Sequence, residues 1–237
     1  MDKQSLRERV WRELEASGAA AFPKPIRGRI PSFVGSREAA RQLGSLPEYL
    51  SAEVIFVNPD AAQLPVREMA LRDGKRLLMA TPKLRHGFLL IEPAEVVDFG
   101  QAATIRGAFG QGKMVSPKEI KVDLIVEGSV AVDRRGGRLG KGGGYGDLEF
   151  AILRELGAVS ETTPIATTVH PLQIVEEVPM TVHDVPVDYI LNPDQVIRTA
   201  RGYPRPQGID WDLLPPDALK RMPLLAELRR EHDHGSR

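Results

Sequence analysis

Residues 134–147, RRGGRLGKGGGYGD, hold seven glycines in fourteen positions and lie between two hydrophobic segments. The segment before them, KVDLIVEGSVAV (121–132), is typical of a buried strand, and DLEFAILRELG (147–157) after them is typical of a helix. Such a turn brings backbone N–H groups together at the positive end of a helix, and glycine lets an anion approach them closely. The pattern predicts a phosphate site, and the alternative is a mobile surface loop.

The charged side chains of this stretch fit a phosphate site. Arg138 and Lys141 add positive charge, and Asp147 either holds a divalent cation that bridges phosphate oxygens or caps the helix. The two common nucleotide-binding patterns do not fit. A P-loop needs Ser or Thr after its Gly-Lys, where this chain has glycine, and a dinucleotide fingerprint that starts at Gly140 has Tyr145 in place of its last glycine.

The composition of the 237-residue chain is that of an ordinary globular protein, with 42% hydrophobic and 27% charged residues. Lys and Arg together number 32, as do Asp and Glu, so we expect no nucleic acid and no anionic membrane as partner. There are no cysteines, which excludes disulfides, thiolate metal sites and cysteine nucleophiles and fits a reducing compartment. Residues 1–18 are charged throughout, and no apolar run approaches the roughly 20 residues that span a bilayer. We therefore expect a soluble, cytoplasmic protein.

Helix and strand patterns alternate along the chain, which is typical of a layered α/β fold with a mainly parallel sheet. The patterns predict helices over 3–16, 36–43 (capped by Ser36), 65–74 and 147–157, and strands over 52–58, 76–80, 87–93, 121–132, 164–170 and 185–191. The C-terminal region is different, because a turn-rich strap precedes a terminal helix over 217–233, and we expect the end from residue 232 to fray. We therefore divide the chain into an α/β domain, residues 1–200, and a C-terminal strap and helix, residues 201–237, that packs on it.

The segment DLIVEGSVAVDRRGGRLGKGGGYGD (123–147) resembles the signature of the 5-formyltetrahydrofolate cyclo-ligase (methenyltetrahydrofolate synthetase) family. In that family a strand ending in P-G-x-A-F-D leads into R-L-G-x-G-x-G-Y-Y-D. The resemblance covers roughly residues 1–198. Its other matching positions are Lys3, Leu6 and Arg7 (K-x-x-L-R), Gly74–Lys75, Glu92–Pro93, and Gln173, Pro179, Asp184 and Asp188 downstream.

The resemblance implies a three-layer open α/β fold with a mainly parallel sheet, of the sugar-isomerase/CoA-transferase-like type. It also implies a ligase of folate and one-carbon metabolism that uses ATP and Mg²⁺. In the family reaction ATP phosphorylates the formyl oxygen of 5-formyltetrahydrofolate, N10 attacks the activated carbon, and loss of phosphate leaves 5,10-methenyltetrahydrofolate. Positioning and charge neutralisation do most of such chemistry. The expected partner is thus a small molecule, a reduced folate or a related heterocycle, and the sequence does not indicate an oligomeric state.

The resemblance also assigns roles to residues of this chain. The implied ATP-binding residues are Lys3, Arg7, Arg138, Gly140, Lys141, Gly142, Gly143, Gly144, Tyr145 and Gly146. The implied substrate-binding residues are Asp60, Lys141, Gly142, Gly143, Gly144 and Tyr145, of which Lys141 and Tyr145 are the catalytic candidates. The implied Mg²⁺ ligands are the carboxylates of Asp147 and Asp184.

The chain departs from the family pattern mostly on the side that holds the folate ring. Gly146 replaces the second tyrosine, Glu127 replaces the proline before the loop, and Asp60 stands for the first Glu of a folate-side segment whose remainder is lost. Residues 93–122 contain no tryptophan, although a flat bicyclic ring needs aromatic contacts. The chain thus resembles a divergent branch of the family. Three hypotheses follow: the folate reaction itself, a paralogue that binds a nucleotide or phosphate ester of another, thiamine-related heterocycle, or an interaction protein without catalysis.

Residue types alone leave simpler interpretations open for several of these positions. Lys3 and Arg7 fit exposed charges on one helix face, and Asp184 fits an Asx turn. His183 fits a structural role, and Asp-Trp-Asp at 210–212 fits a packed turn.

Overall fold

The structure, a computed structural model, describes residues 1–214 and 216–235. Its centre is an eight-stranded sheet with the order β11-β10-β8-β5-β1-β2-β3-β4. Strands β10, β8, β5, β1 and β2 run parallel, and antiparallel strands extend the sheet at both edges. The strands are β1 Val54–Val57, β2 Arg76–Ala80, β3 Phe88–Ile91, β4 Lys113–Val115, β5 Leu124–Glu127, β8 Ile165–Thr168, β10 Tyr189–Leu191 and β11 Val196–Arg198.

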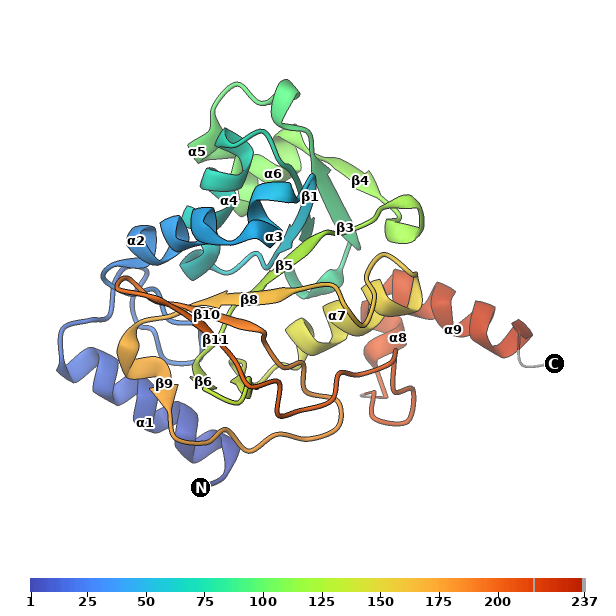
Figure 1. Ribbon diagram of the computed structural model, residues 1–237. Coiled ribbons are helices and arrows are strands. Elements are labelled where there is room, and N and C mark those ends of the chain that lie inside the picture. The colour runs from blue at the N-terminus through green and yellow to red at the C-terminus, as the bar shows by residue number, and fades with distance from the viewer. Residues whose placement is uncertain (215, 236–237) are drawn as a thin grey trace.

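Two hydrophobic layers form around this sheet because successive residues of a strand point to opposite faces. In β1, Val54 and Phe56 pack on one face, and Ile55 and Val57 pack on the other. Helices α7–α9 cover the first face and α2–α6 cover the second, which confirms the predicted three-layer fold (Figure 1). The helices are α2 Ser36–Arg41, α3 Pro47–Ser51, α4 Leu64–Arg72, α5 Phe99–Ala102, α6 Ile105–Gln111, α7 Tyr145–Glu155, α8 Ala218–Arg221 and α9 Pro223–Gly235. Short 3-10 turns are η1 Gln42–Ser45, η2 Ala61–Gln63, η3 Pro82–Leu84, η4 Pro93–Glu95, η5 Pro117–Glu119 and η6 Pro171–Gln173.

A second, three-stranded sheet lies beside the first and carries the N-terminal helix. It consists of β7 (Arg138–Leu139), β6 (Ala131–Asp133) and β9 (Ile174–Val175), in that order. Helix α1 (Lys3–Ala16) is capped by Asp2 and buries the predicted stripe of Leu6, Val10 and Leu14 in a cluster with residues of this sheet. The polar side of α1 is thereby held against the loop that follows β7.

The predicted strand over 121–132 is wrong as one element, because it divides into β5 and β6, which belong to different sheets. The break occurs at Gly128, whose N–H donates to Asn58 Oδ1 at 2.7 Å instead of continuing the ladder. A Cβ at this glycine would lie 2.8 Å from Gln63 Oε1 and 3.0 Å from Ile30, so the chain can turn here only without a side chain. The division turns the chain out of the main sheet just before the glycine-rich loop.

Other boundaries also differ from the expectations. The cap of α2 is Gly35 and not Ser36, which is the first residue of the helix. The strand predicted over 185–191 is shortened to β10, and α5, α6, β4 and β11 were not predicted. The terminal helix divides at Met222, because the proline that follows it can begin a helix but cannot continue one. Residues 232–235 belong to α9, and 236–237 lie outside the described residues, so the frayed end stays a prediction.

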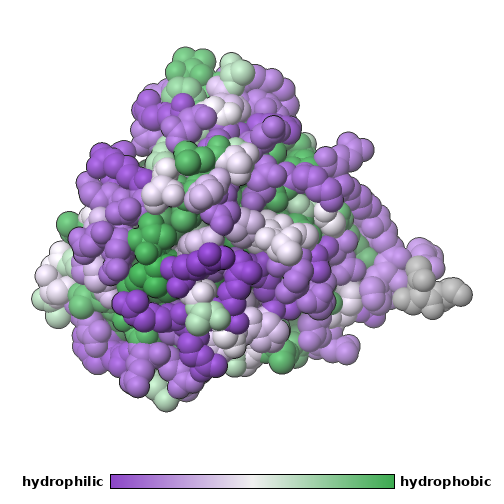
Figure 2. All heavy atoms as spheres, viewed as in Figure 1, coloured by the Kyte–Doolittle hydropathy of each residue, from purple (hydrophilic) through white to green (hydrophobic). Residues whose placement is uncertain are grey.

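The face of the molecule seen in Figure 2 is mostly hydrophilic, with hydrophobic side chains gathered in small areas. The described helices include no stretch that combines the length and the apolar character needed to cross a bilayer.

Candidate functional site

The glycine-rich loop leads directly from β7 into α7, as the sequence predicts. Gly142 and Gly144 have φ angles of +105° and +68°, in the left-handed region that favours glycine, and Gly144 is the N-cap of α7. A Cβ at Gly142 would also lie 3.4 Å from the guanidinium carbon of Arg7. Gly136, in the turn between β6 and β7, has a φ of +99°, and a Cβ there would lie 2.7 Å from the carbonyl oxygen of Val187. The loop glycines therefore shape the site, whereas Gly136 shapes the turn before it.

Helix α1 contributes two cations to the loop. Arg7 donates from Nε to the carbonyl oxygen of Gly140 at 2.7 Å. Lys3 Nζ lies 2.7 Å from Oδ1 and 2.5 Å from Oδ2 of Asp184. Burial lowers the pKa of the Arg7 guanidinium, although nearby carboxylates, Asp184 first among them, oppose this effect. The interpretation of Lys3 and Arg7 as merely solvent-exposed charges is wrong, because each has a partner far away in the sequence.

Arg138 lies beneath the loop, where its side chain is only 3% exposed. It donates to the carbonyl oxygens of Val185 (3.1 Å) and Gly128 (3.0 Å) and to Asp147 Oδ1 (2.6 Å). Burial alone would lower the pKa of Arg138, but Asp147 and Glu127 outweigh it and the pKa is raised. Arg138 is thus a permanent cation that fixes the base of the loop.

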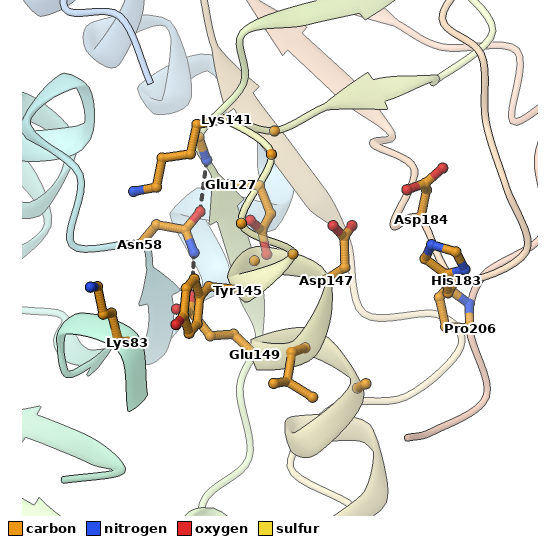
Figure 3. A pocket seen from close by; sticks show the side chains of 18 of the residues that line it. Asn58, Lys83, Glu127, Lys141, Tyr145, Asp147, Glu149, His183, Asp184 and Pro206 are labelled. Carbon is orange, nitrogen blue, oxygen red and sulfur yellow. Dashed lines mark hydrogen bonds between the residues drawn. The ribbon is translucent and has the colours of Figure 1, made fainter. Parts of the chain in front are cut away.

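Asp147 and Asp184 reach the same cavity from different elements (Figure 3). Asp147 is the third residue of α7, not its cap, and its Oδ1 also accepts the N–H of Val185 at 2.9 Å. Asp184 accepts the N–H and the hydroxyl of Thr181 at 2.6 and 2.8 Å. The predicted Asx turn is therefore wrong, because these donors precede Asp184 and the residue two positions after it is a proline, which has no N–H. Burial raises the pKa of Asp184, but the hydrogen bonds from Lys3 and Thr181 prevail and lower it. The lowered pKa favours the ionised form of Asp184, and Asp147 is held in position by Arg138 and the N–H of Val185.

The donor set of this cavity fits Mg²⁺ held together with a phosphate. Within 1–214 and 216–235 no three Asp, Glu, His or Cys side chains come together as a metal cage. Mg²⁺ is typically bound by one or two carboxylates plus phosphate oxygens and water, and Asp147 and Asp184 supply two such carboxylates. The pair therefore suits a metal that arrives with a nucleotide.

Lys141 and Tyr145 lie on the side of the loop that faces β1 and β2. Lys141 Nζ forms an ion pair with Asp60 Oδ1 at 2.5 Å, which joins the glycine-rich loop to the turn after β1. Tyr145 is the first residue of α7, and its ring lies close to Gly143, where a Cβ would be 3.0 Å from Cδ2. Gly146 follows in the first turn of α7. The structure thus gathers every residue that the resemblance assigns to the site.

The cavity in front of the loop has a volume of about 1470 Å³. One part of its wall was not predicted: the strap residues 206–214, together with residues of α8 and α9, line the same cavity as the loop. Trp211 packs against the main core and lines the cavity, so the interpretation of 210–212 as only a packed turn was incomplete. Arg229 of α9 lies over its ring, 5.3 Å from the centroid.

Three polar residues deep in the cavity wall were also missed: Asn58, Glu127 and Glu149. Each is almost fully buried, with exposed fractions of 4%, 0% and 3%. Asn58 Oδ1 accepts the N–H of Gly128, and its Nδ2 donates to Glu149 Oε2 at 2.6 Å. Burial raises the pKa of Glu127 to about 7 and the pKa of Glu149 well above its usual value. For Asn58 the available signal was its place directly after the apolar strand β1, at the carboxyl edge of a parallel sheet, where α/β folds bind ligands.

Residues 1–193 match the 5-formyltetrahydrofolate cyclo-ligase family. The methenyltetrahydrofolate synthase domain-containing protein of Bos taurus is 39% identical over 244 residues, which cover 100% of this chain and 64% of that protein. The protein of the same name from Mus musculus is 41% identical over 243 residues, covering 99% of this chain and 65% of that protein. The chain therefore spans slightly less than two thirds of the length of these relatives.

Among solved structures, the NMR structure of 5,10-methenyltetrahydrofolate synthetase from Aquifex aeolicus is similar, with a TM-score of 0.52. The match covers 85% of this chain and 94% of that chain at 23% identity. At this level of identity the likeness supports the fold, and it agrees with the three layers described above.

Proposed function

The chain belongs to the 5-formyltetrahydrofolate cyclo-ligase family, and from that premise we propose that it is an ATP- and Mg²⁺-dependent ligase that converts 5-formyltetrahydrofolate to 5,10-methenyltetrahydrofolate. In this reaction the terminal phosphoryl group of ATP passes to the formyl oxygen, N10 attacks the activated carbon, and phosphate leaves. The observation that carries the proposal is the glycine-rich loop, whose left-handed glycines, two α1 cations and two carboxylates all meet at one cavity.

The loop and α1 are proposed to hold the triphosphate. The loop from Gly140 to Gly146 enters the N-terminus of α7, where unpaired N–H groups and the helix dipole would favour an anion. Lys3 and Arg7 supply positive charge from the opposite side of the loop. On Mg²⁺ binding with the nucleotide, Asp147 and Asp184 would be its carboxylate ligands, and the metal would neutralise charge on the phosphate oxygens.

Arg138 has a supporting part in this proposal. Three of the five N–H donors of its guanidinium are engaged by Val185, Gly128 and Asp147, which leaves one on each Nη atom for a phosphate. Its fixed charge beneath the loop favours an anion above it, and its hydrogen bond orients Asp147. The predicted phosphate contact of Arg138 stays a prediction.

Lys141 and Tyr145 are the proposed catalytic residues at the formyl group. Lys141 is held by Asp60 at the rim of the cavity, from which its ammonium can move to the developing charge on the formyl oxygen. Tyr145 lies at the first position of α7, between the loop and the part of the cavity that remains for the folate. Asp60 in turn would contact the folate ring when Lys141 leaves it.

One observation favours a second candidate function, the binding of a nucleotide or phosphate ester of a different heterocycle. The ring side of the cavity is built from residues that the family signature lacks, Glu127 and Gly146, and from the strap with Trp211. We further propose a cytoplasmic location, for which the absence of cysteine is the support.

The experiment is to mix the purified chain with 5-formyltetrahydrofolate, ATP and Mg²⁺ and to follow the growth of methenyl absorbance. Omission of ATP and omission of Mg²⁺ are the two controls, and Lys141→Ala should abolish the signal without loss of the folded state. If absorbance does not grow but calorimetry detects Mg·ATP binding, the second candidate replaces the first. If neither occurs, the chain is an interaction protein on this fold.

A further inference from the structure

The floor of the cavity contains an acidic group whose hydrogen bonds are not satisfied by the protein. Glu127 ends β5 and is fully buried, and neither of its carboxylate oxygens accepts a hydrogen bond from any residue that the structure describes. Arg138 forms an ion pair with it, but Nη1 lies 3.6 Å from Oε2, which is too far for a hydrogen bond, and the same Nη1 donates to the carbonyl oxygen of Gly128. Asn58 lies close to Glu127 as well and lowers its pKa slightly, yet its amide donates to Glu149.

A buried carboxylate without hydrogen bonds is unfavourable, so such groups are rare and call for a partner. Hydrogen bonds fix the orientation of the Asn58 amide beside the Glu127 carboxylate. The N–H of Gly128 identifies the acceptor end of the Asn58 amide, so its donor end must face Glu149. The carboxyl groups of Glu127 in β5 and Glu149 in α7 thus share the donors of a single amide, which is used by Glu149. A ligand in the cavity could supply the N–H donors that Glu127 lacks.

Gly146 provides the space for this arrangement. A Cβ at position 146 would lie 2.9 Å from Glu127 Oε2, so even alanine would displace the carboxylate. The glycine is inside the helix, where its backbone conformation does not require glycine. Its role is therefore to leave room for Glu127.

The charges of the cavity are also unevenly placed. Lys3, Arg7 and Lys141 stand around the loop, where a phosphate would lie, whereas Glu127 and Glu149 lie deeper, under the first turns of α7. At the loop Lys3 is paired with Asp184 and Lys141 with Asp60, so a phosphate would have to compete with these carboxylates, whereas the oxygens of Glu127 have no hydrogen-bond donor to give up.

We propose that Glu127, supported by Glu149 and Asn58, is a substrate-binding residue that accepts hydrogen bonds from two adjacent N–H groups on the edge of the heterocycle. A 2-aminopyrimidine edge, with a ring N–H beside an exocyclic amine, presents this pair of donors and matches a carboxylate in the bidentate manner of a guanidinium. The inference deepens the proposed function and rests on it for the presence of a heterocyclic substrate. Glu127 lines the cavity but its side chain is fully buried, so the proposed contact requires a rotation that exposes its oxygens.

The test compares two small probes that differ in one group of this edge, pterin (2-amino-4-oxopteridine) and lumazine, which has an oxygen in place of the amine. Calorimetric titration of the full chain should show at least tenfold tighter binding of pterin, because lumazine presents an acceptor to a carboxylate. Glu127→Gln should reduce this preference to about twofold or less. Glu119→Gln, at an exposed position away from the cavity, is the matched control and should leave the preference intact.

A second variant tests the same inference if Glu127→Gln fails to fold. Gly146→Ala keeps every charge but displaces the Glu127 carboxylate, so it should lose the preference as Glu127→Gln does. Equal binding of the two probes by the wild-type chain, binding of neither, or a preference that survives both substitutions overturns the inference. Because ring binding is measured without turnover, a failure here is distinguishable from a failure of the proposed ligase reaction, which is read from methenyl absorbance.

Discussion

The stability of the Glu127→Gln variant relative to that of the wild type should increase as the pH rises. Most substitutions of a buried polar residue lower stability instead. Burial raises the pKa of Glu127, Arg138 opposes this, and Asp147, Asp60 and Glu149 are the other charged groups around it. The net result is a pKa of about 7, against an ordinary value of 4.5. The folded chain therefore binds this proton more tightly than the unfolded chain does, so stability is present below pH 4.5 and is lost as the pH rises through 7.

The magnitude follows from that pKa difference. At about 1.4 kcal/mol per pH unit, ionisation of Glu127 costs roughly 3 kcal/mol of unfolding free energy at pH 8 and less than about 1 kcal/mol at pH 5. Glutamine has nearly the same shape and does not ionise. The stability of Glu127→Gln relative to the wild type should thus improve by about 2–3 kcal/mol between pH 5 and pH 8, or roughly 5–10 °C in Tm for a chain of this size.

Urea or thermal unfolding of both proteins at half-unit pH steps measures this difference. Glu119→Gln, which changes an exposed carboxylate, should run parallel to the wild type over the whole range. If Glu127→Gln also runs parallel to the wild type, Glu127 is ionised at every pH and acts as the counter-ion of Arg138. That outcome would refute the raised pKa of Glu127.

Three further expectations concern the rest of the cavity. Gly142→Ala and Gly144→Ala should each abolish Mg·ATP binding as measured by calorimetry, because both glycines have left-handed φ angles at the proposed anion site. Each substitution should lower the free energy of unfolding by only about 1–2 kcal/mol. If both variants bind Mg·ATP normally, the loop does not hold the phosphates. Asp184→Asn should weaken nucleotide binding in Mg²⁺ much more than in EDTA, and equal weakening in both would assign it only to the positioning of Lys3. Ligand binding should change the fluorescence of Trp211, which lines the cavity, and leave that of the buried Trp11 unchanged. Trp211→Phe should therefore remove the ligand-dependent change in fluorescence. If the change persists in this variant, the ligand binds elsewhere.

The fold could be predicted from the sequence because its main elements are long apolar runs bounded by strong turn residues. The strand at 76–80 and the helix at 3–16 were predicted at their observed limits. The elements that were missed are short, such as β4 and β11, which have three residues each, lie at the outer edges of the sheet and bury few side chains. The division of 121–132 was missed for a different reason, since it depends on the hydrogen bond between Gly128 and Asn58, residues 70 positions apart.

Some residues of the candidate site could likewise be predicted from a local pattern, and others could not. The loop was found because glycine density, charge and position after a strand all lie within one local segment. Lys3 and Arg7 were assigned only by resemblance, because nothing in α1 itself indicates that β7 and the loop will pack beside it. Glu127 and Glu149 carried no local signal of their own, since their significance is the burial that the sheet and α7 impose on them.

The ring side of the cavity illustrates why a lost motif does not by itself mean a lost subsite. Residues 93–122 hold no tryptophan, and from the sequence this counts against the binding of a flat ring. In the structure, however, the strap places Trp211 on the wall of the same cavity, and its neighbours in α8 and α9 share the core cluster with α7. In our proposal the aromatic surface comes from the C-terminal region and the hydrogen-bond acceptors come from β5 and α7. Glu127 and Gly146 are coupled in this structure, because a Cβ at position 146 would lie 2.9 Å from Oε2 of the Glu127 carboxylate.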